Sequence, residues 1–258
     1  MALFTPSESP AVVVKEVDLS GVVPNVQTST GAIVGNFRWG PVEERKKVSN
    51  ESELVSTFSS PDSTNTIDFH SASMFLKYSN SLEVVRGVTT AAFNAGASTV
   101  GPYDSDGSTD PTKAQLIKNK SQFDSAETGI LAQGPNGLGG KIAVLGKFPG
   151  ALGNSLAVHL LGASDSATPS AFNGWAYKNN FDLAPGTSTY AAKYGSLHDE
   201  CHFAVIDSGG LFTGTKGTVL EAYDAVSVAP DAVKDDGSTN FVRKVVNENS
   251  NYVYFLNF

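Results

Sequence analysis

Two histidines and a cysteine stand close together in the segment HDECH, which includes His198, Cys201 and His202. On a helix, imidazoles four residues apart could both bind a zinc ion. The metalloprotease motif requires glutamate directly after the first histidine, whereas Asp199 occupies that position here. His202 also begins the strand-like run HFAVI, in which residues four apart are far from each other. We therefore interpret the segment as a loop that enters a strand, and we expect no metal site.

The acidic stretch STVGPYDSDGSTDPT resembles a calcium-binding loop in its alternating carboxylates. Asp104, Asp106 and Asp110 supply these groups. Gly107 comes too early for the order of that motif, and no glutamate closes the loop at its twelfth position. The abundance of Ser, Gly, Asp and Pro favours a solvated turn instead.

The glycine-rich stretch AQGPNGLGGK resembles a phosphate-binding loop. That motif has a glycine five residues before its second glycine, whereas Pro135 stands five residues before Gly140. Lys141 is followed by Ile142 rather than by serine or threonine. We interpret this stretch as a glycine-rich hairpin, and the chain as a whole predicts no cofactor.

The remaining polar residues do not suggest an enzyme. A glycan-hydrolysing site needs a pair of carboxylates that face one another. Asp199 and Glu200 are adjacent, so on a strand they point to opposite faces. Trp39 and Trp175, which could stack on sugars, are expected in separate domains. We predict no catalytic residues, although a non-catalytic β-rich binding protein remains an alternative.

Composition narrows the possible partners. The 258 residues are 40% hydrophobic and 17% charged, which is typical of a folded protein with faces that other subunits cover. The net charge of -8 would repel nucleic acid, and no apolar run approaches the ~20 residues that span a bilayer. We therefore expect no nucleic acid and no membrane among the partners. Cys201 is the single cysteine, so no intrachain disulfide can form.

An amino-terminal arm is predicted over residues 1–22. Its strand pattern, AVVVKEVDL, is apolar on both faces at Val12, Val13 and Val14, and Val17 continues it. Ser, Gly and Pro follow and detach this strand from the next element. The strand could pair with a sheet of another subunit, or it could be an ordinary first strand of its own sheet.

Two strands and a turn are predicted from residue 30 onward. GAIVGNF has the character of a buried strand, and KKVS is a second, shorter strand. Between them, Trp39-Gly40-Pro41 is typical of a turn, because glycine allows tight approach and proline fixes φ. Further on, LEVVRGV predicts a third strand.

Two helices are expected between the second and third strands. Asn50 can cap the first, while Glu53 reaches back to the amide of the capping residue. Leu54, Val55 and Phe58 supply its apolar face. The second helix is expected over residues 68–78.

Aromatic residues of this region predict a common core, in which Trp39 and Phe58 lie beside Phe75. The order strand, strand, helix, helix, strand is typical of the start of an α/β layer. A sheet with so few strands leaves edges unpaired.

Strand patterns dominate from Lys141 onward. KIAVLGKF, NSLAVHLL, CHFAVIDS and NYVYFLNF alternate with Gly, Pro, Asn and Asp clusters, and helical patterns are short. This region predicts a β-rich domain over 141–258, separated from a partial α/β core over 23–92 by a loop or insertion over 93–140. Because the last residues are an apolar strand, we expect the chain to be a fragment of a longer, multidomain α+β protein.

Two segments resemble a known family. GAIVGNFRWGPVEERKKVSNESELVSTFSSP, followed by SASMFLKYSNSLEVVRGV, resembles the amino-terminal region of the tail sheath proteins of T4-like contractile bacteriophages. KFPGALGNSLAVHL resembles the family's aromatic-Pro-Gly-x-x-Gly-Asn turn with its following strand. On this basis the structural turn residues are expected at the following positions: Gly35, Gly40, Pro41, Pro149, Gly150, Gly153 and Asn154.

The resemblance implies a structural role in the virion. Sheath subunits of this family stack in rings around an inner tube and shift to a shorter, wider packing that drives the tube through the host envelope. The implied partners are other copies of the chain, the tail tube protein, and the baseplate and tail terminator proteins. The implied location is the phage tail, assembled in the host cytoplasm. A related contractile particle, such as a phage-tail-like bacteriocin, is the alternative.

Overall fold

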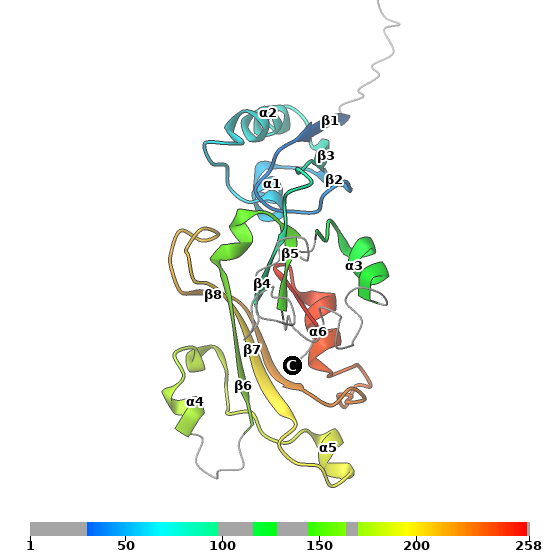
Figure 1. The fold of residues 1–258 in the computed structure, drawn as a ribbon, viewed down its shortest axis with the longest axis vertical. Helices are drawn as coiled ribbons and strands as arrows, with labels where there is room; N and C mark the ends of the chain where they lie inside the picture. The colour runs from blue at the N-terminus through cyan, green and yellow to red at the C-terminus, as the bar shows by residue number, and fades with distance from the viewer. Residues whose placement is uncertain (1–29, 98–115, 128–143, 164–169, 257–258) are drawn as a thin grey trace, which may run out of the picture.

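A computed structural model describes residues 30–97, 116–127, 144–163 and 170–256 of the chain. The described residues form helices and three three-stranded sheets, with strand orders β1-β3-β2, β4-β5-β9 and β6-β7-β8. The first sheet lies with α1 and α2 at one end of an elongated molecule, and β6, β7 and β8 extend to the other end (Figure 1). The mixed α+β class predicted from the sequence is therefore confirmed.

The first sheet and its helices follow the predicted order. Its elements are β1 (Thr30–Gly35), β2 (Arg45–Val48), α1 (Glu51–Phe58), α2 (Thr66–Leu76) and β3 (Ser81–Arg86). The strand β3 is central, since β1 pairs with it in parallel and β2 pairs with it in antiparallel. The two helices pack against this sheet through a cluster of buried apolar side chains: Phe37, Val48, Leu54, Phe58, Phe69, Ala72, Leu82 and Val84.

Three local predictions for this region need correction. We expected a buried first strand, but β1 is an edge strand of alternating burial, and Val34 is 75% exposed. The capping box also differs in one residue. Asn50 Oδ1 accepts from Glu53 N at 2.9 Å as predicted, but Glu53 Oε2 accepts from the amide of Ser49, at 2.8 Å, rather than from that of Asn50. Val55 faces outward on α1, at 36% exposure.

The second and third sheets share one core. The second contains β4 (Asn94–Ala97), β5 (Val144–Pro149) and β9 (Val253–Phe255), and the third contains β6 (Leu156–Gly162), β7 (Glu200–Asp207) and β8 (Thr218–Ser227). Their shared cluster includes Phe203 of β7, Val226 of β8, and Val253 and Phe255 of β9. The predicted strands after residue 141 are all present, but β8 was not among them.

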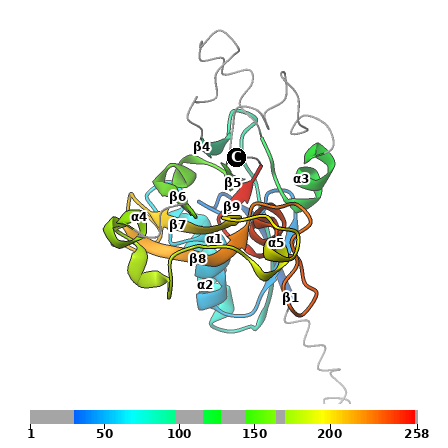
Figure 2. The ribbon, with the colours of Figure 1, turned by 90° about the horizontal axis from the view of Figure 1, so that it is seen from below.

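Short helices surround these two sheets. They are α3 (Lys120–Glu127), the 3₁₀ helices η3 (Ala151–Ser155) and η4 (Lys178–Asn180), α4 (Ser170–Gly174), α5 (Thr189–Lys193) and α6 (Val242–Asn249). The helix α6 buries Val242 and Val246 in the shared core. Its Asn247 side chain accepts from Phe255 N at 2.7 Å and donates to Phe255 O at 3.0 Å, which fixes α6 to β9. The helices α4 and α5 lie toward opposite sides of the third sheet (Figures 1 and 2).

Several predicted features lie outside the described residues. They are the arm residues Val12, Val13, Val14 and Val17, the acidic stretch with Asp104, Asp106, Gly107 and Asp110, and the glycine-rich stretch with Pro135, Gly140, Lys141 and Ile142.

Phe58 provides a test of the first core. Its side chain is fully buried and its ring centroid lies 4.9 Å from that of Phe37. We expect Phe58→Ala to lower the free energy of unfolding by ~3–5 kcal/mol, because the truncation leaves a cavity. Urea denaturation of the 258-residue chain measures this change. The matched control is Val55→Ala on the exposed face of the same helix, and equal losses in the two variants would contradict the placement of Phe58.

Candidate functional site: the Arg86 junction

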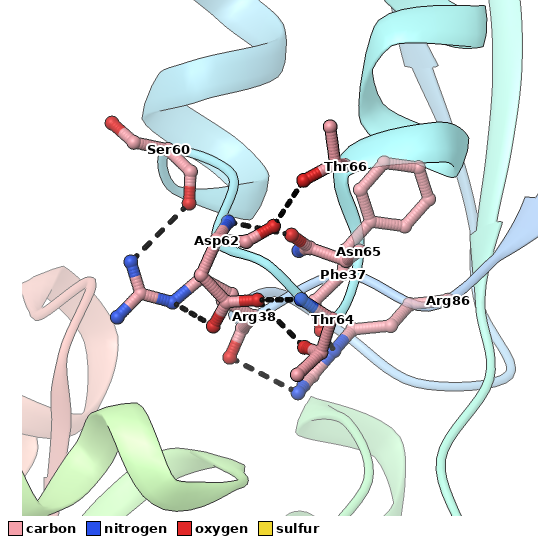
Figure 3. A network of polar contacts seen from close by, with 8 residues as sticks. All are labelled: Phe37, Arg38, Ser60, Asp62, Thr64, Asn65, Thr66 and Arg86. Atoms are coloured by element: carbon pink, nitrogen blue, oxygen red, sulfur yellow. Dashed lines mark hydrogen bonds and ion pairs between the residues drawn. The ribbon is translucent and has the colours of Figure 1, made fainter.

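The first sheet is joined to the second through the side chain of Arg86, the last residue of β3. Arg86 is only 2% exposed, and its side chain donates to four backbone carbonyls. Its Nε donates to Phe37 O at 2.6 Å and its Nη1 to Gly40 O at 2.9 Å. Its Nη2 donates to Arg38 O at 3.2 Å and to Pro149 O at 2.7 Å. The guanidinium lies beneath the turn that carries Phe37 and Arg38 (Figure 3).

The four carbonyls compensate for removing this cation from water. Burial lowers the pKa of Arg86 to about 10, so the guanidinium stays charged at neutral pH. Within the described parts of the chain, no carboxylate forms an ion pair with it. A guanidinium has five N–H groups in a planar fork, which allows one side chain to serve several carbonyls at once. The Arg86 side chain therefore links the two turns by hydrogen bonds to main-chain carbonyls.

Glycines are required at both turns that meet Arg86. Gly40 has φ +97, and a Cβ there would lie 2.7 Å from Phe58 Cδ1 and 2.8 Å from Thr57 O. Gly150 has φ +127, and a Cβ there would lie 3.1 Å from Arg86 Nη2. A side chain at either position would be strained by the backbone conformation, and at Gly40 it would also collide with the helix α1.

The other expected turn residues lie around the same junction. Gly35 ends β1 and packs against Asp68, while Pro41 follows Gly40 and is buried. Pro149 ends β5 and supplies one carbonyl to Arg86. Gly153 lies in η3 against Ala95 of β4. The remaining residue, Asn154, is exposed in η3.

Trp39 lies at the junction rather than in the first core where the sequence analysis places it. Its ring contacts those of Phe148 and Phe212 edge to face, with centroids 5.4 and 5.1 Å apart. Phe212 in turn contacts Tyr252, at 5.2 Å. Phe75 instead packs on the first core, where its ring covers Gly31. The aromatic cluster thus joins the turn at residue 39 to β5 and to the loop after β7.

Asp207 holds the loop that presents Phe212. Its Oδ1 accepts from Ser155 Oγ at 2.5 Å and from Leu211 N at 3.0 Å, and its Oδ2 accepts from Phe212 N at 2.9 Å and Thr213 N at 2.8 Å. Desolvation by itself would raise the pKa of this carboxyl. The hydrogen bonds from Ser155, Thr213 and Phe212 outweigh desolvation, so the pKa lies below its ordinary value.

Arg38 attaches the loop between α1 and α2 to the same turn. Its Nε lies 3.1 Å from Asp62 Oδ2, and its Nη1 donates to Ser60 O at 3.4 Å (Figure 3). Asp62 Oδ1 also accepts from Thr64 Oγ1 and Thr64 N, at 2.6 and 2.8 Å. These hydrogen bonds, together with Arg38, lower the pKa of Asp62.

The HDECH segment enters β7, as predicted, and its side chains have structural partners. His202 is 1% exposed; its Nε2 lies 2.7 Å from Leu183 O and its Nδ1 lies 3.1 Å from Ala225 N. Asp199 accepts from the hydroxyls of Ser188 and Ser227, at 2.7 and 2.5 Å. Cys201 is fully buried, and burial, followed by nearby Asp199 and Glu200, raises the pKa of its thiol to about 12.

The described residues contain no candidate metal site and no helix that could span a membrane. Across 30–97, 116–127, 144–163 and 170–256, no three His, Cys, Asp or Glu side chains are grouped so that they could hold a metal ion. None of the helices in these ranges combines the length and apolar character needed to cross a membrane. The arrangement at Arg86 is suited to holding two sheets in a fixed relation.

Sequence reasoning named the turns but missed the residues that connect them. Arg86 was visible as a cation directly after two valines at the end of a strand, where burial requires several acceptors. Asp207 was visible as an acid that ends the apolar strand FAVID before a Ser-Gly-Gly turn. A charged residue at the end of a buried strand was therefore the sequence signal that could have identified both connecting residues.

Comparison with known proteins identifies relatives for most of the chain. No protein-family model matches. The tail sheath protein of Salmonella phage ViI is 32% identical over 203 residues, which cover 78% of this chain and 26% of that protein. The tail sheath protein of Enterobacteria phage T4 is 44% identical over 80 residues, or 31% of this chain and 12% of that protein. The tail sheath protein of Vibrio phage KVP40 is 37% identical over 100 residues, which cover 36% of this chain and 15% of that protein.

The chain thus spans about a quarter or less of the length of these curated relatives. The resemblance that the motifs indicate is confirmed by the three matches.

Arg86→Met tests the junction. We expect it to lower the free energy of unfolding by at least ~2 kcal/mol, because buried carbonyls lose their donors. Arg86→Lys should recover only part of the loss, since an ammonium cannot reproduce the planar fork. Urea denaturation measures both, with Arg45→Met as the control, because the Arg45 side chain is 76% exposed. A similar loss in Arg45→Met and Arg86→Met would rule out the junction role.

Asp207 predicts a dependence of stability on pH. Because its folded pKa lies below the unfolded value of ~3.9, its contribution is complete above that pH and is lost as the pH falls through the folded pKa. Asp207→Asn should cost ~1–3 kcal/mol at pH 7, since the amide would turn a donor toward the backbone N–H groups. The difference from the unsubstituted chain should narrow below pH ~4.

Denaturation curves between pH 7 and pH 3 give this comparison. Asp182→Asn, at an exposed position, is the control. A gap between Asp207→Asn and the unsubstituted chain that stays constant across the range would show that the carboxylate charge at Asp207 is unimportant.

Proposed function

We propose that the chain forms part of the subunit of a contractile tail sheath, because it resembles the tail sheath proteins of three bacteriophages in sequence. The observation that carries this proposal is the 32% identity with one such protein over 78% of the chain. The named relatives are virion structural proteins of phages, so we favour a phage tail over a bacteriocin-like particle. Because the chain spans a minor part of each relative, the activity of a whole sheath is inferred for the complete subunit.

In the proposed role, the subunit works by packing and catalyses no reaction. Copies of it stack in rings around the tail tube and shift together from an extended to a contracted packing. Such a shift is a change of population between two arrangements of the same subunit, and it releases energy stored in the first. Baseplate and tail terminator proteins would bound the two ends of the stack, and assembly would precede release from the host cytoplasm.

The Arg86 junction supports this role by its rigidity. A subunit that transmits force must keep its parts together while its contacts with neighbours change. Four hydrogen bonds from one buried cation hold the turn at Phe37–Gly40 to Pro149, and the Trp39 ring packs across the same boundary. The first sheet and the second therefore move as one body in our proposal, and the exchange of contacts takes place elsewhere.

The amino-terminal arm is our candidate for the connection between neighbouring subunits. We propose that residues 1–22, with Val12, Val13, Val14 and Val17, add a strand to a sheet of an adjacent subunit. Backbone hydrogen bonds of an added strand survive a change in the angle between subunits. The remaining divisions that we propose are a partial α/β core over 23–92, an insertion over 93–140 and a β-rich domain over 141–258.

Assembly provides the direct test. We expect the polypeptide that contains this chain to form long hollow cylinders of stacked rings, visible by negative-stain electron microscopy. Antibodies raised against the 258-residue chain should decorate these cylinders at regular axial intervals. Discrete monomers at high concentration across a range of salt, or a measured catalytic turnover, would argue decisively against a sheath.

Deletion of residues 1–20 tests, in the same experiment, whether the arm serves assembly or the fold of its own subunit. If the arm links subunits, circular dichroism of the deletion variant should be unchanged while cylinders become rare or absent. Cylinders of normal length would remove the arm from the proposal, and loss of the circular dichroism signal would assign residues 1–20 to the local sheet.

A further inference from the structure

The strand β8 contains a bulge opposite His202 of β7. The register between the two strands shifts between Cys201 and Phe203, so that two residues of β8, Asp224 and Ala225, stand opposite His202 alone. Ala225 has φ +46, a backbone conformation that residues other than glycine rarely adopt. A strained residue of this kind persists only where the surrounding groups hold it.

Two buried side chains hold the backbone of Ala225. Its N–H donates to His202 Nδ1 at 3.1 Å, and its carbonyl accepts from Asn240 Nδ2 at 3.1 Å. His202 is 1% exposed and Asn240 is also buried. The bulge is therefore stabilised by one side chain on the N–H side and by another on the carbonyl side.

The hydrogen bonds of His202 define where its ring carries hydrogen. Nε2 lies 2.7 Å from Leu183 O, and a carbonyl only accepts, so Nε2 is the donor. Nδ1 accepts from Ala225 N, so it carries no hydrogen and the imidazole is neutral in this arrangement. The ring stacks on Phe181, with centroids 4.4 Å apart, which fixes its orientation.

A carboxylate lies within hydrogen-bond distance of the same ring nitrogen. Asp224 Oδ1 is 3.1 Å from His202 Nδ1. An ionised carboxylate only accepts, so it gains a hydrogen bond from Nδ1 when the ring is protonated and not before. A protonated Nδ1 meets the N–H of Ala225 as a second donor, and that hydrogen bond is lost. The neutral and charged forms of His202 thus favour different partners on adjacent residues of β8.

Asp224 is the carboxylate to which protonation of the ring is coupled. Within the described ranges it is the one acidic group that pairs with His202, and its side chain is 52% exposed. Glu200, which shares the face of β7 with His202, accepts instead from Gly186 N at 2.9 Å. The other titratable or charged groups on the elements around the ring are these: His159 on β6, Cys201 on β7, Glu221 and Tyr223 on β8, and Tyr177, Lys178 and Asp182 between α4 and α5.

We propose that His202 is a proton-operated latch on the bulge of β8. In the neutral form, Nδ1 holds the N–H of Ala225 and so maintains the positive φ of that residue. In the protonated form, Nδ1 donates to Asp224 Oδ1, the N–H of Ala225 is released and the bulge relaxes. The step takes one proton from solvent and needs no other reactant. Histidine is the side chain suited to such a change in mildly acidic solution.

Release of the bulge would loosen one end of the third sheet. Asn240 donates to Ala225 O and, through its own carbonyl, accepts from Ser227 N at 2.8 Å, so it connects the bulge to the end of β8. We therefore expect amides at this end of β8 to exchange faster with solvent when His202 is protonated. The first sheet, which the Arg86 junction holds, should be unaffected.

The test is a pH titration of the isotope-labelled 258-residue chain by NMR, from about pH 8 to about pH 5. The nitrogen shifts of each imidazole give its tautomer and its charge. We expect His202 to carry hydrogen on Nε2 alone at the upper end of this range. On acidification Nδ1 should gain a proton, and the amide of Ala225 should change its shift and its exchange rate with the same midpoint.

Three variants provide the comparison. Asp224→Asn removes the acceptor of the charged form at a half-exposed position, so the chain should fold and the midpoint should move to lower pH by about 0.5–1 unit. His202→Gln removes the titrating ring and should abolish the transition of the Ala225 amide. His70→Gln removes an exposed histidine of α2 and should leave the transition unchanged. If His202→Gln folds poorly, Asp224→Asn keeps the experiment decisive.

Three results would overturn the latch. They are a hydrogen on Nδ1 at about pH 8, an amide of Ala225 that exchanges equally before and after protonation, and a ring that stays neutral until the chain unfolds. Each of them would leave the sheath proposal intact, because that proposal rests on sequence similarity and is tested by cylinder formation.

Discussion

The described structure depends on the burial of one positive charge. Removing a guanidinium from water is costly, and Arg86 is compensated by main-chain carbonyls of Phe37, Arg38, Gly40 and Pro149. Main-chain acceptors are available only where the chain turns in a particular way. Gly40 and Gly150 both have positive φ. This backbone conformation shapes the two turns and also directs their carbonyls toward the Arg86 guanidinium.

The same principle recurs farther from the junction, with the sign of the charge reversed. Asp207 collects backbone amides from Leu211, Phe212 and Thr213, and so shapes the loop that brings Phe212 to Trp39. Asn94 does this with a neutral side chain, bridging Ile117 and Gly146. Buried polar side chains with main-chain partners specify how loops and sheets meet, where apolar packing alone would permit several arrangements.

Local elements were predictable because their signals are local. The Asn50 cap, the apolar face of Leu54 and Phe58, and the strand runs after residue 141 each lie within one window of sequence. β8 was missed because its ten residues include Glu221 and Asp224, which obscure a strand pattern. Trp39 was misplaced because its aromatic partners stand more than a hundred residues away in sequence. Contacts between residues so far apart in sequence are determined by tertiary packing, and the hydrophobic periodicity of the sequence carries no information about them.

The two tryptophans of the chain lie in separate environments, so their intrinsic fluorescence can report on two different regions of the protein. Trp39 is 3% exposed among aromatic rings at the junction, whereas Trp175 stacks on Phe181 beside the third sheet, with centroids 5.0 Å apart. Replacing one indole leaves a single emitter whose spectrum reports on one region. Opening of the junction and loosening of the third sheet would thus give distinguishable changes in intrinsic fluorescence, without any attached dye.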